Sequence, residues 1–171
     1  PAMTVPEAAG GGGSALADLG IALEECGAAL ATVPAVEIAV TARTLARLGA
    51  TDRVTAVIGG DVVVTSPRPG DALVPGAAAA SAALLLRGDD LVLVDSPPAG
   101  WPAVPALAAV AAADVTGDAG TVLATGTDAR AAHDLAADEW RALTAAWLVG
   151  LAQRALDIGV TYATERQQFG V

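Results

Sequence analysis

Apolar residues recur at helical spacing in the first section of the chain. Leucine and isoleucine side chains between residues 16 and 30 follow one another at intervals that favour an amphipathic helix, which Ser14 or Asp18 can cap. Pro34 ends this helix, because the residue before a proline rarely adopts helical backbone angles. A second helix is predicted from about residue 35 to Gly49, and glycine is a natural helix stop.

The pattern changes from about residue 50 to residue 127, where short apolar segments alternate with turn residues. This alternation of short apolar segments and turn residues predicts strands rather than helices. Gly88-Asp89-Asp90 lies between two apolar segments and predicts a hairpin turn. A further strand is predicted over Ala108–Val115, although alanine is not typical of strands. The predicted strands are Val54–Ile58, Val62–Thr65, Ala82–Arg87, Leu91–Asp95 and Thr121–Ala124.

A third section, from Asp128 to about Gln168, reads as one long helix with Asp128 as its N-cap. Gly150 and Gly159 lie inside it, and each is expected to let another helix come close, because glycine is otherwise unfavourable in a helix. The residues expected to form one buried face are Leu135, Trp140, Leu143, Trp147, Leu151, Ala155, Ile158 and Tyr162.

These sections predict an α+β fold. Residues 1–50 form an N-terminal helical segment, residues 51–127 a small antiparallel β domain, and residues 128–171 the first long helix of a C-terminal helical bundle. The long helix has few partners within the chain, so we expect it to pack on helices beyond Val171 or on another subunit. The ends at Pro1 and Val171 read as cuts within a longer protein.

Composition narrows the function classes. The formal net charge is −10 and every basic residue is arginine, which argues against a general nucleic-acid surface. The apolar stretch Ala77–Leu86 is too short to span a bilayer. The chain has one cysteine and therefore no internal disulfide, which is typical of a cytoplasmic protein. No metal site is predicted.

A few isolated residues invite simple interpretations. Cys26 is expected to be a small buried core residue, and His133 is expected to be exposed. Trp101 lies in a proline-rich loop, where surface packing is favoured over a ligand contact. The glycine run from Gly10 to Gly13 is expected to be flexible, and it lacks the preceding strand that a dinucleotide-binding loop requires.

The most informative segment is residues 155–171, with the sequence ALDIGVTYATERQQFGV. Tyr162, Arg166 and Phe169 follow at spacings of four and three, which places them on one helix face or its edge. An arginine beside an aromatic ring suits a ligand that combines phosphate with a flat ring system. From the residues alone, a solvated arginine paired with an acid and a core phenylalanine is favoured over that interpretation.

This segment resembles the helix of acyl-CoA dehydrogenases that carries Ala-Leu-Asp, then Tyr-Ala, then Arg-x-Gln-Phe-Gly. Residues 5–13 and Leu23–Gly27 are similar to the Pro-Glu-x-x-Gly-Gly-x-Gly and Glu-Glu-x-Gly segments of that family. The resemblance implies that Arg166 reaches the FAD pyrophosphate of a neighbouring subunit. It also implies that Gln168 and Phe169 contact the same FAD.

The resemblance weakens in the middle section. The family carries a Thr-Glu-Pro-x-x-Gly-Ser loop that binds the flavin and the thioester, and the nearest place here is taken as residues 56–61, which lack those groups. Ser66, Ser81 and Ser96 are substitutes in principle, although each is more simply a turn or strand-edge serine.

No catalytic residue is assigned within the chain. The resemblance implies that the carboxylate base lies beyond Val171. Glu139 and Glu165 are expected to be solvated charges with arginine neighbours, and Asp157 is expected to pack between helices.

The implied function is an FAD-dependent acyl-CoA dehydrogenase, which converts an acyl-CoA thioester into an enoyl-CoA and passes electrons to an electron-transferring flavoprotein. The implied assembly is a homo- or hetero-oligomer acting on fatty acyl or steroid side-chain thioesters. One alternative is a non-catalytic partner subunit that completes the FAD site of a hetero-oligomeric dehydrogenase. Another is an unrelated helix-rich binding module.

Overall fold

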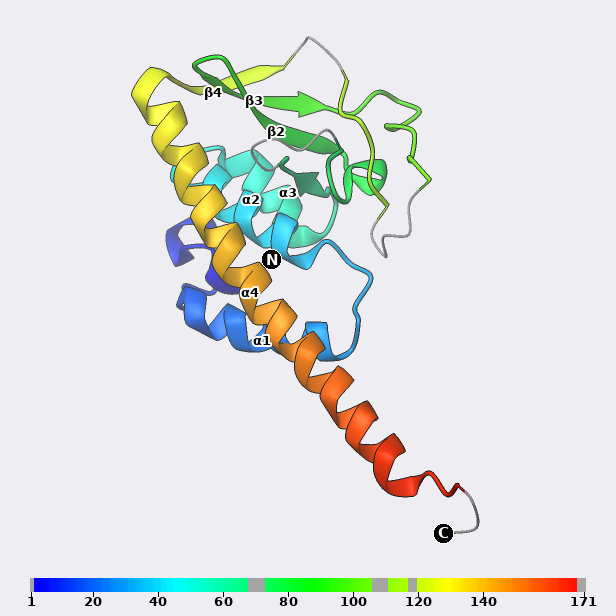
Figure 1. Cartoon of the computed structure of the whole chain (residues 1–171). Coiled ribbons are helices and arrows are strands. Elements are labelled where there is room, and N and C mark those ends of the chain that lie inside the picture. Colours follow the sequence, from blue (N-terminus) through cyan, green and yellow to red (C-terminus); the bar gives the residue numbers. More distant parts are fainter. Residues whose placement is uncertain (1, 68–72, 106–110, 117–119, 169–171) are drawn as a thin grey trace.

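Three short helices and a small sheet lie beside one long helix (Figure 1). The computed structural model describes residues 2–67, 73–105, 111–116 and 120–168. The helices are α1 (Leu16–Ala28), α2 (Ala35–Arg47), α3 (Thr51–Gly59) and α4 (Gly126–Glu165), the strands β1 (Val64–Thr65), β2 (Ala82–Arg87), β3 (Asp90–Asp95) and β4 (Thr121–Thr125), and the short 3-10 turns Ala2–Thr4, Glu7–Ala9 and Ala77–Ala79.

The four strands form one sheet in the order β1-β2-β3-β4. The β2–β3 hairpin is confirmed, and Gly88 takes the left-handed conformation (φ 60°) that its turn requires. The α+β class is confirmed with one amendment, because β1 pairs with β2 in parallel and the sheet is mixed rather than antiparallel.

The strand predicted at Val54–Ile58 is wrong, because this segment belongs to helix α3. Val54 and Val57 are spaced three residues apart and are both fully buried, which is the signature of one helix face. Gly60 ends the helix in a left-handed cap (φ 82°). Only part of the strand predicted at 108–115 is described, and there Ala113 makes isolated bridges rather than a regular strand.

The glycine run at residues 10–13 is a fixed turn, not a flexible segment. The N–H groups of Gly11, Gly12 and Gly13 donate to carbonyl oxygens of the preceding residues 2–6. A Cβ on Gly11 would lie 2.1 Å from the Val5 carbonyl oxygen, so the turn has no room for a side chain. Because these N–H groups are already used, the turn is not a phosphate cradle.

Two helix starts differ from expectation. Helix α1 begins after Ala15, whose N–H donates to Asp18 Oδ2 at 3.0 Å, so Asp18 acts within the first turn. Helix α4 has Thr125 as its N-cap instead of Asp128.

Trp101 is 2% exposed, and its Nε1 donates to the Thr116 carbonyl at 3.0 Å, so it belongs to the core and not to the surface. Cys26 is only half-buried.

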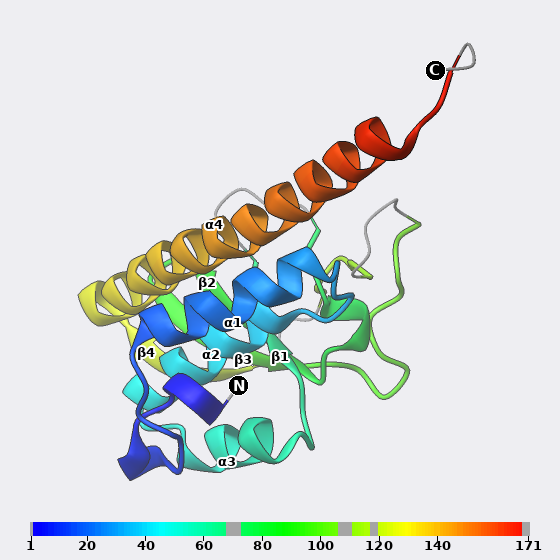
Figure 2. The ribbon, with the colours of Figure 1, turned by 90° about the horizontal axis from the view of Figure 1, so that it is seen from below.

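Helices α1 and α4 cross in close contact, as both ribbon views show (Figures 1 and 2). A Cβ on Gly150 would lie 1.8 Å from the Glu24 carbonyl oxygen, and one on Gly27 would lie 1.9 Å from that of Trp147. The expected close approach at Gly150 is confirmed. Gly159 meets nothing within 4 Å among the described atoms.

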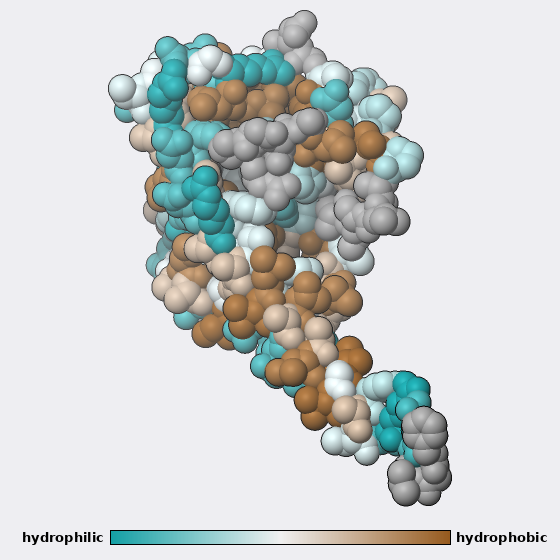
Figure 3. Space-filling model, viewed as in Figure 1, coloured by the Kyte–Doolittle hydropathy of each residue, from teal (hydrophilic) through white to brown (hydrophobic). Residues whose placement is uncertain are grey.

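The second half of α4 projects away from the body of the protein (Figure 1), and all its described residues from Ala152 to Gln168 are exposed. The predicted buried face is observed only in the middle of α4, from Trp140 to Leu151. The other residues predicted to belong to it are exposed: Leu135, Ala155, Ile158 and Tyr162. Hydrophobic side chains follow this projecting half (Figure 3). Within the described residues, no helix is long and apolar enough to cross a membrane.

Candidate functional site

The end of strand β1 meets helices α2 and α4 at a cavity. The strand stops at Thr65, whose Oγ1 donates to the Pro75 carbonyl at 2.7 Å. Ser66 follows, and its Oγ donates to the Leu84 carbonyl at 3.0 Å. These bonds fix the chain where it leaves the sheet and turns beneath α4.

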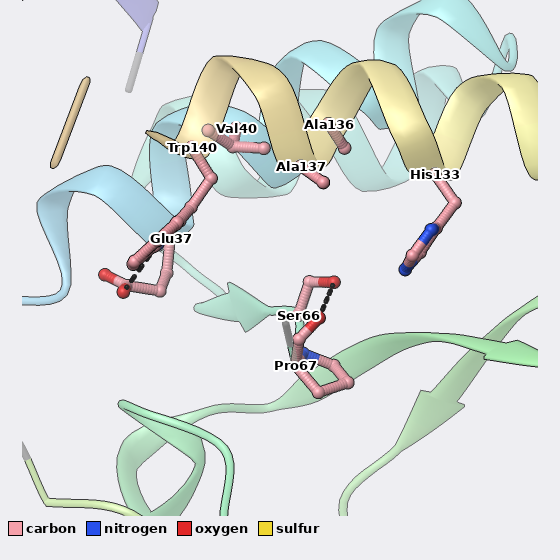
Figure 4. A pocket seen from close by; sticks show the side chains of 8 residues that line it. All are labelled: Glu37, Val40, Ser66, Pro67, His133, Ala136, Ala137 and Trp140. Atoms are coloured by element: carbon pink, nitrogen blue, oxygen red, sulfur yellow. Dashed lines mark hydrogen bonds between the residues drawn. The ribbon is translucent and has the colours of Figure 1, made fainter. Parts of the chain in front are cut away.

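Three elements line this cavity (Figure 4). Its polar groups are Glu37 of α2, Ser66 after β1, and His133 of α4. Trp140 Nε1 donates to Glu37 Oε1 at 3.2 Å. His133 was expected to be exposed, but its side chain is only 15% exposed. The full lining is Glu37, Val40, Ser66, Pro67, His133, Ala136, Ala137 and Trp140.

An ionic cluster around the buried Glu139 joins α2 to α4. Glu139 is 6% exposed, which corrects the expectation of a solvated charge. Its Oε1 accepts hydrogen bonds from Arg43 Nη2 at 2.8 Å and from Arg47. Arg43 Nη1 also donates to the Thr4 carbonyl at 2.6 Å, which ties the N-terminal turn to the same cluster.

The charge state of Glu139 follows from these contacts. Burial raises the pKa of Glu139, but the hydrogen bonds and charges of Arg43 and Arg47 outweigh this effect and hold the pKa below the ordinary value of 4.5. The carboxylate therefore stays ionised and paired. This makes Glu139 a structural anion rather than a proton acceptor for a substrate.

Arg166 and Gln168 lie at the far end of α4, away from the cavity. The Arg166 guanidinium lies over the Tyr162 ring, 5.0 Å from its centroid. With its amide oxygen turned toward Arg166, Gln168 accepts a hydrogen bond from Arg166 Nε at 2.8 Å. All three side chains are exposed. Phe169, the third predicted FAD contact, lies outside the described residues.

The arrangement at this helix end fits an anionic ligand. Across the described part of the chain, Arg166 forms no ion pair with a carboxylate, so the pairing favoured by the residues alone is not observed. An exposed guanidinium whose charge is uncompensated can take both oxygens of a phosphate group. Among the described residues, Asp157 is exposed and accepts a hydrogen bond from Gln153 Nε2 at 2.8 Å, so its expected packing between helices is not observed there.

The segment that best keeps the flavin-loop pattern is not residues 56–61. Residues 56–59 belong to helix α3, whereas Thr65-Ser66-Pro67 follows a strand and borders the cavity. Together with Gly70, this segment keeps the Thr, Pro and Gly of the Thr-Glu-Pro-x-x-Gly-Ser pattern at the right spacing. Position-by-position comparison with that pattern would have found it. Glu37 was also missed, since a single glutamate within a helical pattern carries no signal.

Comparisons with known proteins bear on this arrangement. No protein-family model and no curated protein sequence matches the chain. A solved structure of a variant of the Tcur3481-Tcur3483 steroid ACAD (acyl-CoA dehydrogenase) matches with a TM-score of 0.83 and 30% sequence identity. The match covers 99% of this chain and 55% of the matched chain, so the chain spans about half the length of that protein. This match across nearly the whole chain shows that the protein belongs to the acyl-CoA dehydrogenase family.

Proposed function

We propose that the protein works in the FAD-dependent α,β-dehydrogenation of an acyl-CoA thioester. The observation that carries this proposal is the exposed Arg166 at the end of a helix in a chain of acyl-CoA dehydrogenase fold. FAD, when bound, supplies the acceptor for the hydride from the β-carbon. The α-proton goes to a carboxylate base, and an electron-transferring flavoprotein takes the electrons onward.

Two parts of the chain have separate roles in this proposal. The cavity between α2, α4 and the end of β1 receives the acyl portion of the thioester. Arg166, Gln168 and Phe169 serve an FAD site of a neighbouring subunit. The geometry supports this division, because Arg166 follows the C-terminal end of α4, whereas the α4 residues that line the cavity, from His133 to Trp140, lie in its first half.

A second candidate is a partner subunit that completes a neighbour's FAD site without performing catalysis itself. The altered middle section favours it. The segment that begins at Thr65-Ser66-Pro67 keeps only part of the Thr-Glu-Pro-x-x-Gly-Ser pattern that binds flavin and thioester in the family. The matched protein carries a two-part name, Tcur3481-Tcur3483, which accords with paired subunits in that protein. Bulky acyl groups, including steroid side chains, are the proposed substrate class for this candidate.

Flavin content separates the two candidates. The intact protein is purified alone and after co-expression with its partner subunit, and FAD per chain is measured from flavin absorbance. A self-sufficient dehydrogenase is expected to carry one FAD per chain when purified alone. A completing subunit is expected to carry flavin only in the co-purified complex. Absence of flavin from both preparations would refute both candidates.

A further inference from the structure

A second hollow lies next to the cavity described above. It is an open cleft of about 150 Å³ between the loop before α2 and the middle of α4. The first cavity holds only about 30 Å³. Two residues, Glu37 and Trp140, line both spaces. The complete lining of the cleft is Ala31, Val33, Ala35, Val36, Glu37, Trp140, Thr144 and Trp147.

The shared residues form a wall that is held by a hydrogen bond. Trp140 descends from α4 and Glu37 rises from α2, and they meet through the 3.2 Å bond from Nε1 to Oε1 (Figure 4). In this view they close one side of the cavity, while His133 stands at the opposite side. Both residues are half-buried, so the bond is partly shielded from water and holds the indole in place.

The cavity has polar groups in its lining and the cleft is mainly apolar, so together they suit one elongated ligand with a polar end and a hydrocarbon end. His133 gives the first cavity an imidazole group that can donate a hydrogen bond to a carbonyl oxygen, whereas the Ser66 hydroxyl already donates to the Leu84 carbonyl. The cleft beyond the wall is lined mainly by alanine, valine and tryptophan, which favours hydrocarbon. A cavity of about 30 Å³ has room for little more than one or two water molecules. A long acyl group therefore fits only if it passes the wall.

We propose that Trp140, held by Glu37, is a specificity-determining wall that limits the length of acyl group admitted to the cavity. Removing the indole joins the cavity to the cleft and lets the distal end of a longer acyl group extend toward Trp147. Glu37 acts as a positioning residue, since it reaches the ligand through Trp140. This inference rests on the proposed function for the identity of the ligand.

The test uses S-alkyl-CoA thioethers, from methyl to hexadecyl, which cannot be dehydrogenated as thioesters are. Their affinity for the intact protein with its partner subunit is measured by calorimetry. Affinity is expected to rise about fourfold for each buried methylene until the chain reaches the wall. In Trp140→Ala the rise is expected to continue over about two further methylenes, so that the longest probes bind about fifteenfold more tightly than to the unmodified protein.

Three further variants test whether the length limit depends on Trp140 and on its hydrogen bond to Glu37. Trp147→Ala removes an indole from the cleft alone and should leave the length limit unchanged. Glu37→Ala should extend the limit because it removes the hydrogen bond that orients the indole, whereas Glu37→Gln keeps a side-chain oxygen as acceptor and should retain the limit. The Glu37 pair also keeps the test decisive if Trp140→Ala does not fold.

The outcomes distinguish failure of the wall from failure of the proposed function. Binding with the same length limit in the unmodified protein, Trp140→Ala and Glu37→Ala would overturn the wall and leave the proposed function standing. A steady rise of affinity with no limit in the unmodified protein would also overturn the wall. Binding of no probe by any variant would overturn the proposed function and the acyl assignment together.

Discussion

Replacing Glu139 with alanine should lower the free energy of unfolding by about 1–3 kcal/mol, because it leaves the half-buried Arg43 without its charged hydrogen-bond partner. Arg43 and Arg47 both donate to the same oxygen, Glu139 Oε1, and Arg43 also holds the Thr4 carbonyl. The substitution should therefore weaken the attachment of the N-terminal turn as well as the contact between α2 and α4. Denaturant unfolding of the intact protein gives the measurement.

Glu165 supplies the matched control for this change, since it is also a glutamate of α4 but is exposed. Glu165→Ala should change stability by no more than about 0.5 kcal/mol. Equal effects of the two substitutions would show that the cluster around Glu139 contributes nothing beyond an exposed charge.

The same cluster should make stability depend on pH. The pKa of Glu139 is lowered in the folded protein, so its contribution is fully present above the ordinary value of 4.5 and is lost as the pH falls through the lowered value. The stability difference between the unmodified protein and Glu139→Gln should therefore be constant near neutral pH and shrink below about 4.5. A difference that does not change down to strongly acidic pH would contradict the lowered pKa.

Gly150→Ala should destabilise the protein by about 1–3 kcal/mol, the usual range for forcing extra volume into a packed contact. The new methyl group would meet the Glu24 carbonyl oxygen, which belongs to the backbone of α1 and cannot turn aside as a side chain can. The helices would have to move apart. Gly27→Ala should act in the same direction, because its Cβ would meet the Trp147 carbonyl oxygen.

Gly159→Ala is the control for the helix crossing. It lies in the same helix, and a Cβ there meets nothing within 4 Å among the described atoms. Alanine is the better helix former by about 1 kcal/mol, so this change should stabilise the projecting half of α4. Thermal unfolding of the three variants would test the crossing, and a stabilising Gly150→Ala would contradict it.

Local pattern predicted the parts of this fold whose signals are local. The β2–β3 hairpin has a continuous apolar pattern on both sides of its Gly88 turn, and α4 has apolar residues at helical spacing. Helix α3 was missed because a nine-residue segment rich in valine and isoleucine satisfies strand propensity as well as helical spacing. Its two buried valines face α2 and the sheet, and this packing decides the outcome.

Burial of polar residues could not be predicted in the same way. The residues that flank Glu139 in the sequence are typical of an exposed helix position. Its burial follows from the contact of α4 with α2, whose Arg43 and Arg47 donate to the carboxylate. Trp101 lies in a proline-rich segment, yet the Thr116 carbonyl accepts its indole N–H inside the core. The cavity at Glu37, Ser66 and His133 joins three distant segments, so no local motif marks it.

The end of α4 is proposed to contribute to an FAD site. The most direct measurement is the dissociation constant of FAD for the reconstituted complex carrying Arg166→Ala, compared with Arg154→Ala, which removes an exposed arginine elsewhere on the same helix. Loss of a charged hydrogen-bonding group should weaken FAD binding by about tenfold to a hundredfold in Arg166→Ala alone. Unchanged affinity in Arg166→Ala, or equal weakening in both variants, would contradict this proposal.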